Sequence, residues 1–289
     1  MKVKFFILIF LFSTKIFSFA EQSIFLDRPL VIASIAPYKF LIESIAENTV
    51  DILTIVPPNC DPHTYEPTPK HISKIQKSIL WIRIGEPFET FYEKSLETSS
   101  FCRILDMRKN INLLSYSGCS HKHATHKYQN FDSHIWLSPK LLKLQASHIF
   151  NTLCELFPEH EELYKKNYIS LIEKLNNVHK DIKKIFKQRK PSCIAVVHPA
   201  FAYFGQDYDI TQISIENGLS IDPSLKDLKK ILLSIKDQKI KTIFLQKNLS
   251  NKSGIVIAKK LNLNPIILDP YQENVIENLK YIATAFAQS

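Results

Sequence analysis

Three histidines and one aspartate stand in short stretches that could together hold a metal ion. The first stretch is Asp61–Pro69, which contains His63, and the second is Asp132–Pro139, which contains His134. The third, Val196–Pro199, contains His198, and Asp269 follows the apolar run Ile266–Leu268. Three imidazoles and one carboxylate form a four-ligand nitrogen and oxygen set, which suits a divalent transition metal.

The positions of these residues predict that they meet between two halves of the chain. His63, His198 and Asp269 each follow an apolar, strand-like run, and His134 precedes a helix. Ligands of open parallel sheets bind beyond the carboxyl ends of the strands. Two candidates come from each half, so we expect them to converge in the cleft between the halves. Proline beside three of the four residues stiffens the backbone there, which favours a preformed site.

A second group of histidines lies in a polar segment without helical or strand periodicity, at about residues 107–131. His121, His123 and His126 stand there among lysines and small polar residues. This composition predicts a weak auxiliary metal site on a loop, and the alternative is an ordinary solvated loop. The five cysteines are odd in number and include no CxxC pair, so the spacing does not support a cysteine zinc site. Cys60 is interpreted as a loop or core thiol.

Strands and helices alternate along both halves of the sequence, which predicts an α/β fold with parallel sheets. Apolar branched runs predict strands near residues 30–36, 52–56, 79–84, 102–105, 193–197, 241–245 and 265–268. Between the halves, apolar residues recur at intervals of four and three from Tyr164 to Ile185. Acidic residues stand at the start of this stretch and basic residues at its end, as the helix dipole favours. We therefore expect two Rossmann-like lobes joined by one long rigid helix.

The predicted organisation has four parts. Residues 1–20 combine Lys2 and Lys4, the apolar run Phe5–Phe12 and a small residue at Ala20. This pattern is typical of a secretory signal peptide, so we expect export to the periplasm and cleavage near Ala20. An N-terminal α/β lobe over 21–158, a linking helix over 159–190 and a C-terminal α/β lobe over 191–289 follow.

The net charge of +9 invites a nucleic-acid interpretation. The lysines are scattered over predicted helix faces and no nucleic-acid motif is present, so we expect no nucleic-acid partner. We also expect a monomer.

The motifs resemble those of the metal-binding solute-binding proteins of bacterial zinc and manganese ABC importers. The resemblance rests on Asp61–Pro69, Asp132–Pro139, Val197–Phe204, Pro223–Leu228 and Leu268–Pro270, and it covers essentially the whole chain after residue 20. It implies two lobes joined by one helix and a metal held at their interface by His63, His134, His198 and Asp269. It also implies delivery of the metal to a membrane permease. Gln246 stands where these proteins often have an acidic residue.

Two questions remain open at the level of the sequence. A histidine at position 198 favours Zn²⁺, whereas Mn²⁺ or Fe²⁺ prefer more oxygen ligands, so these metals are the alternatives. An exported metallohydrolase is the rival class of function. The sequence contains no HExxH motif and no GxGxxG or P-loop, so we expect no enzymatic activity.

Overall fold

The computed structural model describes residues 28–66, 68–96, 102–116, 131–216 and 223–289. The predicted signal peptide, Cys119 and the three loop histidines His121, His123 and His126 lie outside these residues. No helix in the described ranges is both long and apolar enough to span a bilayer.

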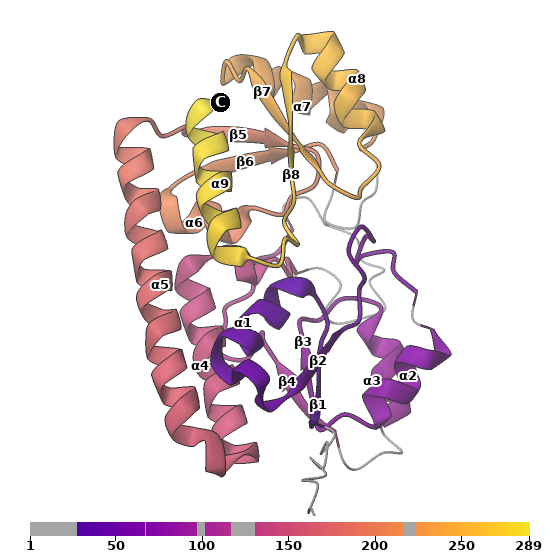
Figure 1. Cartoon of the computed structure of the whole chain (residues 1–289). Coiled ribbons are helices and arrows are strands. Elements are labelled where there is room, and N and C mark those ends of the chain that lie inside the picture. The colour runs from indigo at the N-terminus through magenta and orange to yellow at the C-terminus, as the bar shows by residue number, and fades with distance from the viewer. Residues whose placement is uncertain (1–27, 67, 97–101, 117–130, 217–222) are drawn as a thin grey trace, which may run out of the picture.

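Two four-stranded parallel sheets form the centres of two lobes, as the alternation of strands and helices predicts (Figure 1). The N-terminal sheet has the order β2-β1-β3-β4 and the C-terminal sheet the matching order β6-β5-β7-β8. The first sheet contains β1 (Leu30–Ala33), β2 (Asp51–Thr54), β3 (Leu80–Arg83) and β4 (Arg103–Asp106). The second contains β5 (Cys193–Val196), β6 (Thr211–Ser214), β7 (Thr242–Gln246) and β8 (Asn264–Leu268).

Helices cover these sheets at positions that the sequence largely predicts. The N-terminal lobe carries α1 (Ala36–Ala46), α2 (Pro69–Gln76), α3 (Glu89–Leu96) and α4 (Pro139–Leu156). The C-terminal lobe carries α6 (Ala202–Tyr208), α7 (Leu225–Asp237), α8 (Lys252–Leu261) and α9 (Val275–Gln288). Short 3-10 turns lie at Glu47–Thr49, Ile135–Leu137 and Pro158–His160. Thr68 and Ser138 cap α2 and α4 by accepting backbone N–H groups, and proline follows each cap.

The long helix is α5 (Glu161–Gln188), which runs along both lobes (Figure 1). Its 28 residues correspond to a length of about 42 Å at ~1.5 Å per residue. Glu161 and Glu162 lie in its first turn and Lys187 in its last, which confirms the predicted polarity. The helix packs against α1 and α4 of one lobe and against α9 of the other, so it links the lobes through side-chain contacts.

The main hydrophobic core is continuous from the N-terminal sheet, through α4 and α5, to α6 and α9. A smaller second core lies on the other side of the C-terminal sheet, where α7 and α8 cover it. Since the main core includes residues of both halves, the two lobes are packed as one body along α5.

One strand, β6, is absent from the sequence-based expectation. Its residues Thr211–Ser214 are mostly polar and partly exposed, because β6 lies at the edge of its sheet and pairs only with β5. An edge strand of four residues does not produce the apolar run that identifies a buried strand.

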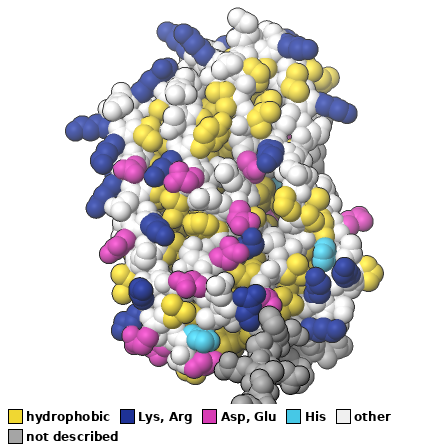
Figure 2. Space-filling view, viewed as in Figure 1, with side chains coloured by type: hydrophobic (Ala, Val, Ile, Leu, Met, Phe, Trp, Pro, Cys, Tyr) yellow, Lys and Arg dark blue, Asp and Glu magenta, His cyan; other side chains and the backbone are white. Residues whose placement is uncertain are grey.

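On the surface, lysine and arginine side chains are scattered and do not gather into one patch on the face shown in Figure 2.

Candidate metal centre

His63, His134 and His198 converge between the lobes, as the sequence predicts. One ring nitrogen from each histidine lies within 4.8 Å of the others. The ring centroids of His63 and His198 are 4.7 Å apart, and those of His134 and His198 are 5.3 Å apart. These three form the group of potential metal ligands found among the described residues. Their imidazoles can offer three nitrogen donors to a single ion.

The parallel sheets explain this convergence. His63 lies in the loop after β2, and His198 comes two residues after the end of β5. His134 directly precedes the 3-10 turn Ile135–Leu137, which leads into α4. Tyr203 of α6 accepts a hydrogen bond from the backbone N–H of Leu114 and donates one to the carbonyl of Asp132. This bridge ties the segment that carries His134 to the C-terminal lobe.

Two buried carboxylates orient the histidines of the N-terminal lobe. Nδ1 of His63 lies 2.9 Å from Oε2 of Glu86, and Nδ1 of His134 lies 2.7 Å from Oδ1 of Asp132. A carboxylate accepts a hydrogen bond, so each pair places the proton on Nδ1 and leaves Nε2 for a metal. Ser133 donates a further hydrogen bond to Glu86, which joins the two pairs.

The electrostatics of the Glu86 pair favour a charged state. Burial lowers the pKa of His63, but the charge and hydrogen bond of Glu86 outweigh it and raise this pKa to about 9. Burial raises the pKa of Glu86, whereas His63 and Ser133 lower it to about 2. A metal ion that binds Nε2 of His63 therefore has to displace a proton near neutral pH.

His198 has a different environment. Within the described residues, neither of its ring nitrogens has a hydrogen-bond partner, and its Nδ1 lies 3.9 Å from Oε2 of Glu216. Burial lowers the pKa of His198, and the nearby His63 and His134 lower it further, so the ring is neutral. A buried imidazole without partners is costly in a protein interior. Binding of an ion would supply the missing partner.

Asp269, the fourth predicted residue, does not join the three imidazoles. Its Oδ2 lies 3.0 Å from Nζ of Lys247, and its Oδ1 accepts the backbone N–H of Tyr271 at 3.0 Å. The side chain that does reach the imidazoles from this segment is Tyr271. Its hydroxyl oxygen lies 3.3 Å from Nε2 of His63 and 3.3 Å from Nε2 of His134.

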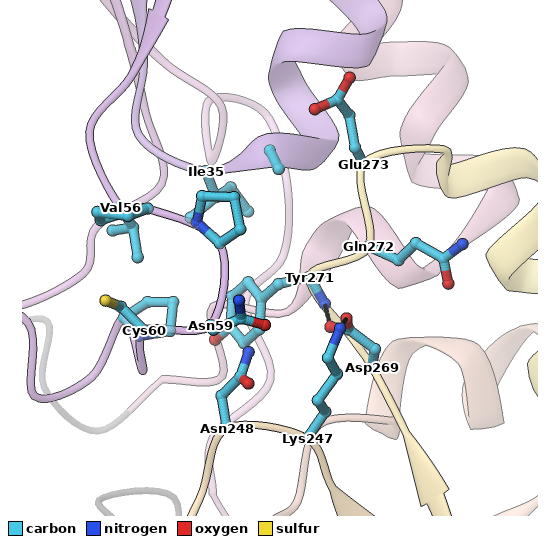
Figure 3. A pocket seen from close by; sticks show the side chains of 14 residues that line it. Ile35, Val56, Asn59, Cys60, Lys247, Asn248, Asp269, Tyr271, Gln272 and Glu273 are labelled. Atoms are coloured by element: carbon cyan, nitrogen blue, oxygen red, sulfur yellow. Dashed lines mark hydrogen bonds and ion pairs between the residues drawn. The ribbon is translucent and has the colours of Figure 1, made fainter.

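Asp269 and Tyr271 also line a cavity of about 200 Å³ between the lobes. Its walls come from the segment around Pro57–Cys60 of one lobe and from Lys247 and the segment 271–273 of the other. Figure 3 shows Lys247 reaching Asp269 in this cavity, while the ring of Tyr271 points away from that pair. The cavity therefore adjoins the imidazoles through Tyr271.

Sequence reasoning missed Glu86, Asp132 as a partner of His134, and Tyr271. Glu86 follows β3 and meets His63 only in the folded chain, so no local spacing indicates it. Asp132 was visible in the motif around His134, and the Asp-x-His spacing could have indicated an orienting carboxylate.

The four cysteines in the described ranges are free thiols, and Cys60 is partly buried.

A family of periplasmic component A proteins of zinc-uptake complexes matches residues 31–287 of the chain. A relative from Chlamydia trachomatis, named only provisionally as metal-binding, is 40% identical over 90% of this chain and 91% of its own. The zinc-binding protein AdcA of Streptococcus pyogenes is 27% identical over 88% of this chain, which spans about half of AdcA (52%).

The solved structures include one of ZnuA at 29% identity, with a TM-score of 0.81 over 91% of this chain and 99% of that one. A zinc-bound deletion mutant of ZnuA is 30% identical, with a TM-score of 0.81 over 90% of this chain and 97% of that one.

Proposed function

Since the chain belongs to the family of periplasmic zinc-uptake components, we propose that it captures Zn²⁺ between its lobes and delivers it to an ABC importer permease. The observation that carries this proposal is the group formed by His63, His134 and His198, whose ring nitrogens lie within 4.8 Å of one another. Imidazole nitrogen is a preferred zinc ligand, and tetrahedral zinc needs only one donor more.

The donor set supports zinc over manganese or iron. Three imidazole nitrogen donors suit zinc, whereas Mn²⁺ favours carboxylate and carbonyl oxygen. The role of Asp269 as the fourth ligand stays a prediction. Its carboxylate binds Lys247 and would have to leave that partner to reach the ion. His121, His123 and His126 stay predictions as a weak auxiliary site.

The carrier role also accounts for the placement of the site. The ion would lie between the two lobes, beyond the ends of β2 and β5. A partner that separates the lobes would expose it. Export directed by residues 1–20, cleavage near Ala20, the domain boundaries given above and a monomeric state belong to the same proposal. Enzymatic hydrolysis is the alternative, and it requires an ion with an open position for water.

Calorimetric titration of residues 21–289 with Zn²⁺, with Mn²⁺ as competitor, tests the proposal. Changing His63, His134 or His198 to alanine should weaken zinc binding at least ~100-fold, about 2.7 kcal/mol. His160→Ala is the matched control, because the His160 ring lies outside the histidine group, 5.7 Å from the ring of Tyr164, and its loss should leave the affinity unchanged. Unchanged zinc affinity in the three single variants, or turnover of ester, peptide or phosphate substrates by the zinc-loaded protein, would contradict the carrier role.

A further inference from the structure

Three turns of one kind surround the histidine group. In each turn an aspartate Oδ1 accepts the backbone N–H of the residue two positions later, at 3.0, 2.9 and 3.0 Å. Aspartate side chains form such turns readily and fix the direction of the chain that follows. The three pairs are Asp61 with His63, Asp132 with His134, and Asp269 with Tyr271.

The first two turns each present a ring donor atom to the site, and the third presents the hydroxyl of Tyr271. That oxygen lies 3.3 Å from Nε2 of His63 and 3.3 Å from Nε2 of His134. In a tetrahedral zinc site with bonds of ~2.0–2.1 Å, neighbouring donor atoms lie roughly 3.3–3.4 Å apart. The hydroxyl oxygen therefore has the separation from two imidazoles that a fourth donor would have.

Asp269 corresponds in this comparison to Asp61 and Asp132, which orient a donor and do not themselves join the group of ring nitrogens. Both of its carboxylate oxygens already have partners, the Lys247 ammonium and the backbone N–H of Tyr271. In Figure 3 its carboxylate meets Lys247, and the ring of Tyr271 points away from that pair. These contacts fit a positioning residue.

The segment that carries Tyr271 is anchored on both sides. Trp136 donates from Nε1 to the carbonyl of Pro270 at 2.8 Å, and its ring centroid lies 5.1 Å from that of Tyr271. Asn278 donates from Nδ2 to the carbonyl of Asp269 at 2.8 Å. Since Trp136 follows His134 by two residues, the positions of the His134 ring and of Tyr271 are set together.

We propose that the hydroxyl oxygen of Tyr271 is the fourth donor to the ion, and that Asp269 positions Tyr271. The inference rests on the proposed function, in which the three histidines bind zinc. The oxygen offers a lone pair and keeps its proton, so no covalent bond is broken. A tyrosine in this place completes the donor set without adding a carboxylate charge.

The test compares residues 21–289 with the variants Tyr271→Phe and Asp269→Asn. Tyr271→Phe should weaken zinc binding at least ~10-fold. It should also change the visible spectrum of Co²⁺ bound in place of zinc, because that spectrum reports the donor set. Asp269→Asn keeps an oxygen that can accept the N–H of Tyr271, so its loss should be smaller and the Co²⁺ spectrum should persist.

Tyr65→Phe is the matched control, because it removes a hydroxyl that binds His71 in the same loop region as His63. It should leave the zinc affinity and the Co²⁺ spectrum unchanged. A larger loss in Asp269→Asn than in Tyr271→Phe would overturn the inference in favour of Asp269. Tighter zinc binding by Tyr271→Phe would overturn it too, since the hydroxyl would then compete with the ion. Failure of the proposed function is a separate result, namely wild-type zinc affinity in the three histidine variants.

Discussion

The N-terminal and C-terminal lobes share one strand order, but they hold their histidines in different ways. In the N-terminal lobe, His63 and His134 each have a buried carboxylate on Nδ1, at 2.9 and 2.7 Å. In the C-terminal lobe, His198 has no hydrogen-bond partner on either ring nitrogen among the residues that the structure covers. The N-terminal lobe therefore fixes the orientation of its imidazoles by hydrogen bonds within the protein. In the C-terminal lobe, a bound ion would supply the partner that the His198 ring lacks.

This difference gives the histidines of the two lobes different roles in metal binding. Hydrogen-bonded carboxylates fix the ring orientations of His63 and His134, and His63 releases a proton when its Nε2 binds an ion. The unpartnered ring of His198 costs free energy until an ion provides its partner. An ion bound by all three histidines would then join the C-terminal lobe to the N-terminal pair.

The largest expected effect is a difference in unfolding free energy between histidine variants of the two lobes. His134→Leu removes a metal ligand and leaves the buried Asp132 without its ring partner, which should cost about 1–3 kcal/mol of unfolding free energy in the apoprotein. His198→Leu should also abolish tight zinc binding but should leave the unfolding free energy of the apoprotein unchanged or higher. Urea unfolding with excess chelator measures both, and an equal loss in the two variants would contradict the comparison.

The pH dependence of zinc affinity should follow His63. Because Glu86 raises the pKa of His63 to about 9, above the ordinary value of about 6.5, this pair stabilises the apoprotein below about pH 6.5 and the contribution is lost as the pH rises through about 9. Zinc needs the deprotonated Nε2, so the affinity should rise up to ~10-fold per pH unit between pH 6.5 and 9. In Glu86→Gln, competition titrations should show this rise ending at a lower pH. A wild-type affinity that is constant above pH 7 would show that His63 binds no proton there.

The smallest effect concerns the orienting carboxylate of His134. Asp132→Asn keeps an oxygen acceptor at Nδ1 but removes the negative charge, so zinc affinity should fall about 10-fold. Glu216→Gln is the matched variant of the C-terminal lobe, where the carboxylate lies 3.9 Å from His198, and it should have a weaker effect. Calorimetry on both variants provides the comparison, and the reverse order would show that the lobes are not different in this respect.

The fold could be predicted from the sequence wherever burial leaves an apolar run. Leu30–Ala33 and Cys193–Val196 are buried central strands and were visible for that reason, whereas the polar edge strand Thr211–Ser214 was not. The three histidines could be predicted because each follows a strand end or opens a helix. The partner Glu86 could not, because only the pairing of β1 with both β2 and β3 brings it beside His63.

The region around Asp269 shows a second limit of the sequence. A carboxylate directly after a strand is a reasonable metal ligand, and the resemblance to metal carriers supports the same residue. Which of two side chains in a turn faces the site depends on competing contacts, here Lys247 with Asp269 and Trp136 with Pro270. Such contacts join segments more than twenty residues apart and are determined by the fold.

A zinc anomalous difference map from crystals of residues 21–289 grown with one equivalent of Zn²⁺ would locate the bound ion. We predict one strong peak between the lobes, within about 2.0–2.1 Å of a ring nitrogen of His63, His134 and His198. A peak bound elsewhere on the chain, with these three imidazoles left without metal, would contradict it.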